Sequence, residues 1–330
     1  MRYFVTGATG FIGGRLARRL RAAGHEVTAL VRSPSRAAEL AALDIALAPG
    51  DITDPATLRA PMRGADGVFH VAAWYGFGLR AGRQAERVNV EGTRHVLEAV
   101  RALGIPRGVY TSTLAVFSDT RGRVVDESYR FTGRHLTRYD DTKARAHALA
   151  ESMMGEGLPL VIVQPGVVYG PGDTSALHDS WVAYLRRRLP VVPAGTAYCW
   201  AHVDDVVHAH VLAMERGRPG ESYIVAGSCH SLVDAFAIAE RITGIPAPRL
   251  HPPRAVMRAL AAVAGVAERV LPLPPTYTRE GLVSTSGVTY LGDNAKARRE
   301  LGYAPRPLEE GLRETLAWEM RALGMPTPAS

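Results

Sequence analysis

The glycine-rich segment at residues 6–13 constrains the fold of this chain more than any other feature. It reads Thr-Gly-Ala-Thr-Gly-Phe-Ile-Gly, follows a short apolar run, and precedes an amphipathic stretch at residues 15–23. Gly7 permits a tight turn, Gly10 lets the backbone approach a pyrophosphate, and Gly13 lets a helix pack closely on a strand. The order strand, glycine loop, helix therefore predicts a dinucleotide site at a helix N-terminus.

A rare lysine is the second informative feature. The chain holds 39 Lys plus Arg, of which only Lys143 and Lys296 are lysine. Lys143 follows Tyr139 by four residues, so on a helix the phenol and the ammonium share one face. Arginine would serve equally well as a surface charge, so this lysine favours chemistry that a guanidinium cannot do. The Tyr-x-x-x-Lys spacing is common by chance and gains its weight from the glycine loop upstream.

Alternating strands and helices define the expected fold. Apolar strand-like runs lie at residues 3–5, 27–31, 67–71, 108–111 and 160–164, with helical stretches such as 84–103 and 139–154 between them. This order predicts an α/β fold, a Rossmann doubly wound parallel sheet with a smaller C-terminal α/β substrate lobe. We expect residues 1–170, plus a strand near 222–226, in the dinucleotide-binding domain. Residues 171–220 and 227–330 are expected in the substrate lobe.

Composition excludes several classes of protein. Hydrophobic and charged contents of 47% and 22% are ordinary for a soluble globular chain. The net charge is +7, but the arginines are scattered rather than grouped with aromatics, so we expect no nucleic-acid partner. The weakly charged segment 255–267 is too short to span a bilayer. The chain starts directly with a strand, and two cysteines are too few for a disulfide framework, so we expect a cytoplasmic protein without a signal peptide.

These and later motifs together resemble the extended short-chain dehydrogenases/reductases of the NAD(P)-dependent epimerase/dehydratase superfamily. Within it, the chain is similar to dihydroflavonol reductases and to hopanoid-associated sugar epimerases. The resemblance covers nearly the whole chain. It is carried by the glycine loop, by Tyr139 with Lys143, and by segments 50–54, 70–73, 88–93, 110–113, 165–171 and 202–205.

The resemblance implies three catalytic residues. Tyr139 would transfer a proton, Lys143 would hold the nicotinamide ribose and lower the pKa of the tyrosine, and Thr113 would bind the substrate oxygen. Free tyrosine titrates near 10, and a fixed ammonium beside it stabilises the phenolate. For Thr113 the alternative is a hydroxyl that only caps a backbone group.

The end of the second strand indicates which nicotinamide cofactor binds. Arg32 lies there, followed by Ser33 and Arg36, with no carboxylate before Glu39. A guanidinium pairs with a 2′-phosphate, whereas an acid would bind the ribose hydroxyls of NAD. We therefore favour NADP(H), with NAD(H) possible if Arg32 is only a surface group. The resemblance places further residues on the dinucleotide, namely Phe11, Ile12, Asp51, Ile52, Ala72, Ala73, Pro165 and Val168.

The sequence identifies candidate substrate-binding residues less clearly than cofactor-binding ones. Trp74, Tyr75 and Phe77 form an aromatic cluster that is either core packing or a substrate wall, and Tyr169 is a further candidate beside Thr113. Asn89 would support a helix near the cofactor or lie on a helix surface. No metal is expected, because the resemblance makes segment 202–205 structural, with Asp204 or Asp205 capping a helix.

The type of reaction is indicated by residues that similar dehydratases and nucleotide-sugar enzymes have and this chain lacks. Similar dehydratases place Asp-Glu after the catalytic threonine, where this chain has Leu114 and Ala115. Nucleotide-sugar enzymes of the superfamily carry an arginine near the position of Tyr198. We therefore expect an NADP(H)-dependent reductase of an apolar or aromatic carbonyl compound, with a sugar epimerase as the alternative and a non-catalytic NADP(H) sensor as the third. A homodimer through helices 84–103 and 139–154 is also expected from the resemblance. Apolar residues at helical spacing would form the interface unless they face the sheet instead, namely Val96, Leu97, Val100, Leu149 and Met153.

Overall fold

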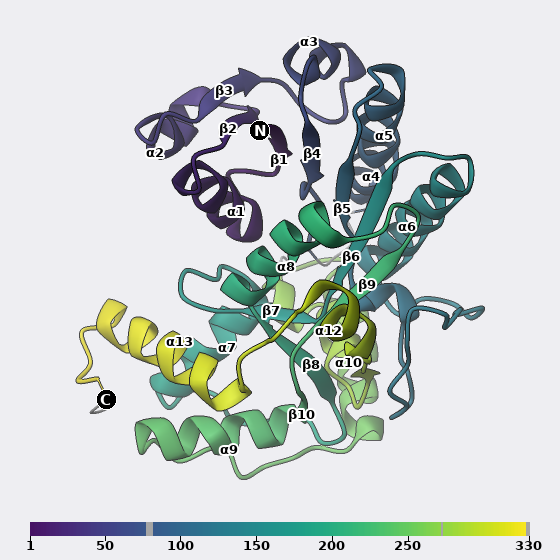
Figure 1. Ribbon diagram of the computed structural model, residues 1–330. Helices are drawn as coiled ribbons and strands as arrows, with labels where there is room; N and C mark the ends of the chain where they lie inside the picture. Colours follow the sequence, from purple (N-terminus) through teal and green to yellow (C-terminus); the bar gives the residue numbers. More distant parts are fainter. Residues whose placement is uncertain (77–81, 272, 328–330) are drawn as a thin grey trace.

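The framework of the molecule is a seven-stranded sheet in which every neighbouring pair is parallel. The computed structural model describes residues 1–76, 82–271 and 273–327 (Figure 1). The strand order β3-β2-β1-β4-β5-β6-β9 confirms the predicted doubly wound sheet. The strands are β1 (Arg2–Thr6), β2 (Glu26–Val31), β3 (Ala46–Pro49), β4 (Gly67–His70), β5 (Gly108–Thr111), β6 (Leu160–Pro165) and β9 (Ser222–Val225).

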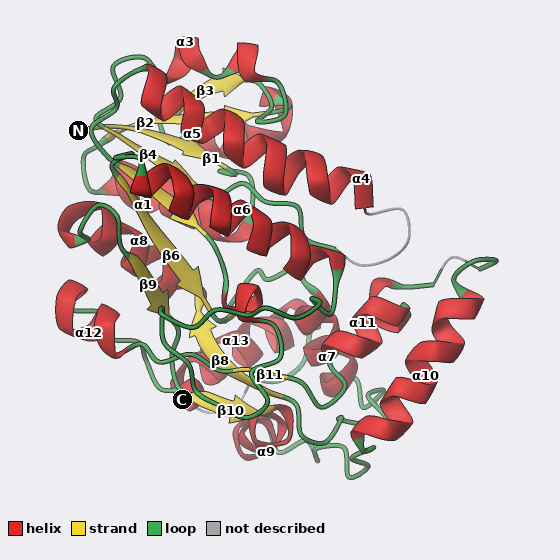
Figure 2. Ribbon diagram, turned by 90° about the vertical axis from the view of Figure 1, so that its right-hand side faces the viewer, coloured by secondary structure: helices red, strands yellow, loops and turns green. Residues whose placement is uncertain are grey.

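Helices cover both faces of this sheet, as strands buried on both sides require (Figures 1 and 2). In β1, Tyr3 and Val5 face one layer and Phe4 faces the other, because successive side chains of a strand alternate. The first layer holds α1 (Phe11–Ala22), α2 (Ala38–Ala41), α8 (Val203–Arg216) and α12 (Ala295–Leu301). The second holds α3 (Arg59–Met62), α5 (Thr93–Ala102) and α6 (Arg138–Gly155).

A second, smaller sheet forms the core of the smaller lobe, which the sequence predicts to bind the substrate. Its strands run in the order β10-β8-β11, and β7 pairs with β8. They are β7 (Val167–Tyr169), β8 (Ala197–His202), β10 (Cys229–Ser231) and β11 (Thr289–Tyr290). Helices α7 (Ala176–Leu185), α9 (Leu232–Thr243) and α13 (Leu308–Ala322) pack around them in one apolar cluster. Helices α10 (Arg254–Ala267) and α11 (Arg279–Ser284) pack on each other at the edge of the lobe.

Three elements pack across the boundary between the two expected parts of the chain. Helix α8 lies within residues 171–220, yet it packs against α1 and the large sheet, as does α12 from the C-terminal part. Conversely, β7 precedes residue 171 but pairs with the small sheet. The buried apolar residues of α8 and α12 belong to the cluster on one face of the large sheet. We therefore describe these two helices together with that sheet.

The residues that suggested a dimer interface are buried within the chain itself. Val96, Leu97 and Val100 of α5 and Met153 of α6 belong to the core beneath the large sheet, and Leu149 packs against it. The outer side of α6 is mainly polar. These apolar positions are therefore explained by contact with the sheet.

The two cysteines pair with each other. Cys199 on β8 and Cys229 on β10 are directly opposite in antiparallel register, and a disulfide joins them. One cross-strand bond is no disulfide framework, but it differs from the reduced cysteines on which the expected cytoplasmic location partly rests. Among the described residues, none of the helices is both long and apolar enough to pass through a bilayer.

Candidate active site

The glycine loop forms a backbone cradle at the carboxyl end of β1. Gly7 has a φ of 75°, and a Cβ atom there would lie 2.7 Å from the amide nitrogen of Ala72. A Cβ on Gly13 would collide with the carbonyl of Gly7. Helix α1 begins at Phe11 without a side-chain cap, so the N–H groups of its first turn remain available to a ligand. This geometry fits the pyrophosphate of a dinucleotide.

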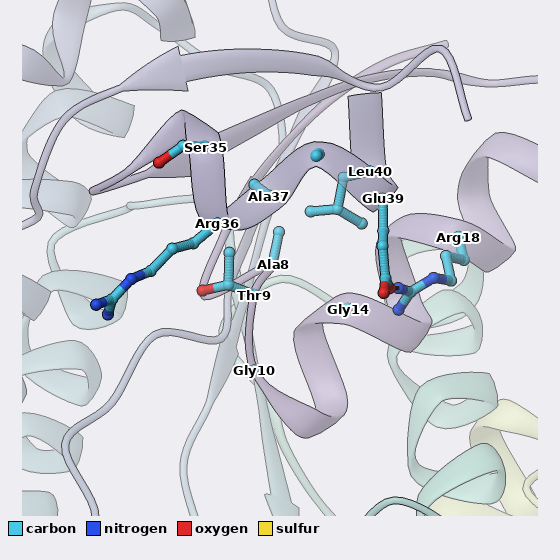
Figure 3. Close-up of a pocket in the computed structure, with 11 residues that line it drawn as sticks. Ala8, Thr9, Gly10, Gly14, Arg18, Ser35, Arg36, Ala37, Glu39 and Leu40 are labelled. Atoms are coloured by element: carbon cyan, nitrogen blue, oxygen red, sulfur yellow. Dashed lines mark hydrogen bonds and ion pairs between the residues drawn. The ribbon is translucent and has the colours of Figure 1, made fainter. Parts of the chain in front are cut away.

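A pocket of about 350 Å³ lies between the glycine loop and the loop after β2 (Figure 3). Thr9 and Gly10 line one side, and Ser35 and Arg36 line the other. The acid on this wall, Glu39, is engaged by Arg18 at 2.9 Å. Among the described residues the Arg36 side chain has no hydrogen bond or ion pair, and Glu39 is paired with Arg18, an arrangement compatible with a bound phosphate. Arg32 is exposed at the start of the same loop.

The other predicted cofactor residues lie at the carboxyl ends of the strands or just beyond. Asp51 and Ile52 follow β3, and the carboxylate of Asp51 accepts from the Thr53 amide at 2.9 Å. Ala72 and Ala73 follow β4 next to the glycine loop, and the Ala72 amide donates to the Thr6 hydroxyl. Pro165 ends β6, and Val168 lies in β7.

The predicted catalytic residues meet at the end of β5. Helix α6 starts at Arg138 with Thr137 as its cap, which places Tyr139 and Lys143 one turn apart. A hydrogen bond joins the side chains of Tyr139 and Thr113. Thr113 also caps the short helix η5 (Leu114–Phe117) by accepting from the Ala115 amide at 3.2 Å, so its capping role is observed and its role towards a substrate stays a prediction.

The electrostatics differ from the expectation in one respect. The Lys143 ammonium donates to the Thr111 carbonyl at 2.8 Å and to the Tyr110 hydroxyl at 3.1 Å, both on β5. Burial lowers the pKa of Lys143 to about 7. Burial also raises the pKa of Tyr139 above its usual value, and its hydrogen bond to Thr113 opposes this only in part. In this structure the tyrosine is therefore a protonated phenol, not the acidified phenol that the resemblance implies.

An aromatic ring faces Tyr139, the tyrosine predicted to be catalytic. The rings of Tyr75 and Tyr139 meet edge to face, with centroids 4.9 Å apart. Asn89 holds the loop behind Tyr75, because its amide group accepts from the Trp74 N–H at 2.7 Å and donates to the Trp74 carbonyl at 3.1 Å. Phe77 lies outside the described residues.

Asn89 is a buried residue that links two segments by hydrogen bonds, and it does not lie on a helix surface. It is buried within the π-helical segment η4 (Glu86–Gly92), and it also donates to the Thr142 hydroxyl of α6 at 3.0 Å. Segments of π-helix often occur at functional sites. Asn89 thus ties the Trp74 loop to the helix that carries Tyr139 and Lys143.

Tyr169 is not available to a substrate. Its side chain is 1% exposed in the core of the lobe, where its ring contacts Trp200 and His202. A Cβ on Gly311 of α13 would collide with the Tyr169 hydroxyl, which shows how closely α13 covers this ring.

The structure adds a group that the sequence did not reveal. Tyr198 and Tyr290 stack with centroids 6.1 Å apart, and the Tyr290 hydroxyl donates to the Asp140 carboxylate at 3.0 Å. Burial raises the pKa of Asp140 to about 7. Asp140 follows Tyr139 directly in α6, so the small sheet and the catalytic helix meet at this contact. In the sequence, the only sign of this tyrosine pair was Tyr198 at a position where similar enzymes carry an arginine.

The segment at residues 202–205 connects the small sheet to the Rossmann sheet, because it ends β8 and begins α8. His202, and not Asp204 or Asp205, caps α8, by accepting from the Asp204 amide at 3.3 Å. His202, Asp204 and Glu314 lie close enough to hold a cation, but Asp204 pairs with Arg15 at 2.9 Å and Glu314 with Arg306 at 2.9 Å. The carboxylates are therefore already matched by guanidinium groups.

This combination of Rossmann cradle, pocket and Tyr/Lys/Thr group defines an enzyme of the nicotinamide-dependent short-chain dehydrogenase/reductase type. Residues 3–226 match the model of the NAD dependent epimerase/dehydratase family, and the chain belongs to that family.

Individual relatives span almost the full length of the chain. A putative dihydroflavonol 4-reductase of Synechocystis sp. is 34% identical, with 96% of this chain and 94% of the relative covered. A 4-hydroxy-2-methyl-3-oxo-4-farnesyl-3,4-dihydroquinoline-1-oxide ketoreductase of Stigmatella aurantiaca is 35% identical over 93% and 92% of the two chains. The crystal structure of gox2253 superposes with a TM-score of 0.82 at 32% identity, covering 98% and 99%.

Proposed function

We propose that this protein is an NADP(H)-dependent reductase that converts a ketone or aldehyde of an apolar or aromatic small molecule into an alcohol. The observation that carries the proposal is the contact between Tyr139, the proton donor, and the ring of Tyr75, 4.9 Å away. The stacked rings of Tyr198 and Tyr290 are buried behind the same helix and make its surroundings apolar and aromatic. A flat apolar ring fits such surroundings, because aromatic faces and edges pack well on each other.

When bound, the nicotinamide supplies the hydride that reaches the carbonyl carbon. The Thr113 hydroxyl is placed to donate a hydrogen bond to the carbonyl oxygen, and the Tyr139 hydroxyl to give that oxygen its proton. A raised pKa keeps Tyr139 protonated at neutral pH, which is the form that reduction needs. Lys143, one turn away, would stabilise the phenolate left after proton transfer.

The choice of NADP(H) over NAD(H) is supported by two arginines. Arg32 is exposed at the end of β2, and Arg36 lines the pocket opposite the glycine loop. Neither side chain forms a hydrogen bond or ion pair with the described residues. Since Glu39 is held by Arg18, no free carboxylate lines this pocket to repel a 2′-phosphate.

An epimerase is the second candidate, because the matching family includes epimerases. Epimerization returns the hydride to a keto-sugar that stays bound, so the enzyme must hold the nucleotide diphosphate tightly. Where similar nucleotide-sugar enzymes carry an arginine for this purpose, this chain has Tyr198, whose hydroxyl donates to the Ser284 carbonyl at 3.1 Å. Dehydration is disfavoured, because Leu114 and Ala115 cannot move a proton. A non-catalytic sensor would have no need for the Tyr139, Lys143 and Thr113 group.

Two further statements rest on the resemblance and on composition. We propose a homodimer and a cytoplasmic location. The dimer would pair the outer sides of α5 and α6, which carry exposed polar residues such as Arg94, Glu98 and Arg145. Light scattering at micromolar concentration tests it, and a particle of 35.5 kDa would refute the dimer.

The experiment that tests the proposed function is a substrate screen followed at the absorbance of NADPH. Aromatic ketones, prenylated ketones and long-chain 3-oxo compounds are compared with UDP-sugars. We expect continuous NADPH oxidation with at least one carbonyl class and none with UDP-sugars. Tyr139→Phe is the control, because it should stop oxidation without weakening NADPH binding. Thermal stabilisation by a UDP-sugar alone, without oxidation, would favour the epimerase.

A further inference from the structure

Helix α10 exposes an apolar face that no described part of the chain covers. Met257, Ala261 and Ala264 on one side of the helix are buried against the lobe. On the opposite side Leu260, Val263 and Val266 are 50%, 68% and 66% exposed. We call this surface the α10 face, and it comprises Ala255, Val256, Ala259, Leu260, Ala262, Val263 and Val266.

The pattern of the α10 face is ordered along the helix. Val256, Leu260, Val263 and Val266 follow one another at spacings of three and four residues, which places them in one stripe along the axis. Val270 and Leu271, just beyond the helix end, are also exposed, at 81% and 58%. A contiguous apolar stripe of this kind is uncommon on the surface of a soluble protein and marks an interaction site.

The exposed charges at the edge of the α10 face are basic. The helix contains no Asp or Glu, its C-cap Glu268 is partly buried, and Arg258 is exposed at one edge of the face. Arg269 follows just beyond the last turn and is also exposed. A helix with an apolar stripe bordered by arginines matches the surface of an anionic bilayer, where side chains enter the acyl boundary and guanidinium groups meet phosphates.

The position of α10 connects this face to the active site. In Figure 2, α10 and α11 lie side by side at the outer edge of the lobe, away from the large sheet. Glu280 of α11 accepts from the amide of Arg138, the residue before Tyr139, at 3.2 Å. The Ser284 carbonyl at the other end of α11 accepts from the Tyr198 hydroxyl. One short helix thus separates the α10 face from Tyr139 and Tyr198.

We propose that the α10 face docks this protein reversibly on the surface of an anionic lipid bilayer, with α10 parallel to the membrane plane. The helix is too short to span, so the interaction is interfacial. A second copy of the chain is the other occupant that the test below distinguishes. The proposal does not depend on the proposed reaction.

Vesicle flotation tests the docking directly. The full chain is mixed with phosphatidylcholine vesicles that contain about one third phosphatidylglycerol, and with vesicles of phosphatidylcholine alone. We expect binding to the anionic vesicles and much weaker binding to the neutral ones. The double variant Leu260→Asp, Val263→Asp should weaken binding to the anionic vesicles at least about 10-fold. Arg258→Gln should weaken it about five-fold, on anionic vesicles only.

Controls separate the face from general effects. Leu43→Asp changes an exposed leucine near α2, on the Rossmann domain, and should leave binding unchanged. Thermal unfolding of each variant establishes that it is folded, and exposed positions should tolerate the change. Failure to bind either vesicle, or equal binding by wild type and the double variant, overturns the proposal. A wild-type dimer that the double variant converts to a monomer, without vesicle binding, would assign the face to a second copy instead.

Discussion

Replacing Lys143 with methionine should stabilise the protein without cofactor, and more so at lower pH. Burial brings the pKa of Lys143 from 10.5 in the unfolded chain to about 7 in the folded protein. Between these two values the unfolded chain holds a proton that the folded protein does not. Wild-type stability therefore rises with pH in this window, and it falls towards pH 7.

The magnitude follows from the size of the shift. Each pH unit inside the window changes the free energy of unfolding by about 1.4 kcal/mol. From pH 9 to pH 7 the advantage of Lys143→Met over wild type should grow by about 2 to 3 kcal/mol. Loss of the lysine hydrogen bonds to Thr111 and Tyr110 offsets part of the advantage at every pH, but it does not change the slope.

Urea unfolding followed by tryptophan fluorescence at pH 7, 8 and 9 measures this difference. Taking the difference between variant and wild type cancels the titration of the other groups. Lys296→Met is the matched control, and it should destabilise the protein because Lys296 pairs with Glu221 at 2.6 Å. A difference between Lys143→Met and wild type that does not change with pH would refute the reasoning, since it would mean that Lys143 stays charged in the folded protein.

Three further predictions concern the site. Tyr139→Phe should lower kcat about 10²- to 10⁴-fold while the dissociation constant for NADPH, measured by fluorescence titration, stays nearly the same; equal turnover would exclude Tyr139 as the proton donor. Arg32→Asp should reverse or abolish the preference for NADPH over NADH in the same titration, and a wild type that binds NADH more tightly would make Arg32 a surface group only. Asn89→Ala should lower the free energy of unfolding by about 1 to 3 kcal/mol, because it removes the partner of the part-buried Trp74 N–H and carbonyl, while Thr142 keeps its bonds to the Arg138 and Tyr139 carbonyls; a loss below about 0.5 kcal/mol in urea unfolding would contradict that role.

Local signals predicted the parts of the site that are close in sequence. The glycine loop needs only a strand before it and a helix after it, and the spacing of Tyr139 and Lys143 needs only one helical turn. The alternation of strand-like and helical stretches also predicted the parallel arrangement of the large sheet. Strand β3 was missed, because Ala46–Pro49 lacks the β-branched and aromatic residues that mark strands.

Contacts between distant segments were not predictable from one sequence. Tyr290 reaches Asp140 across 150 residues, and no motif marks either residue. The Lys143 ammonium bonds to β5, since its nearest acceptors depend on how α6 packs on the sheet. For the same reason, the burial of Tyr169 beneath α13 could not be read from a strand-like pattern alone.

Isotope transfer tests the central claim most directly. The enzyme is supplied with NADPH that carries deuterium at the transferred position of the nicotinamide and with a carbonyl compound selected by the screen. A reductase places one deuterium on the carbinol carbon of the released alcohol and forms one NADP⁺ for each alcohol. An epimerase returns the hydride within the site, so a sugar nucleotide would interconvert with no net change in cofactor. We predict deuterated alcohol in one-to-one ratio with NADP⁺, and epimerization without cofactor consumption would contradict the account.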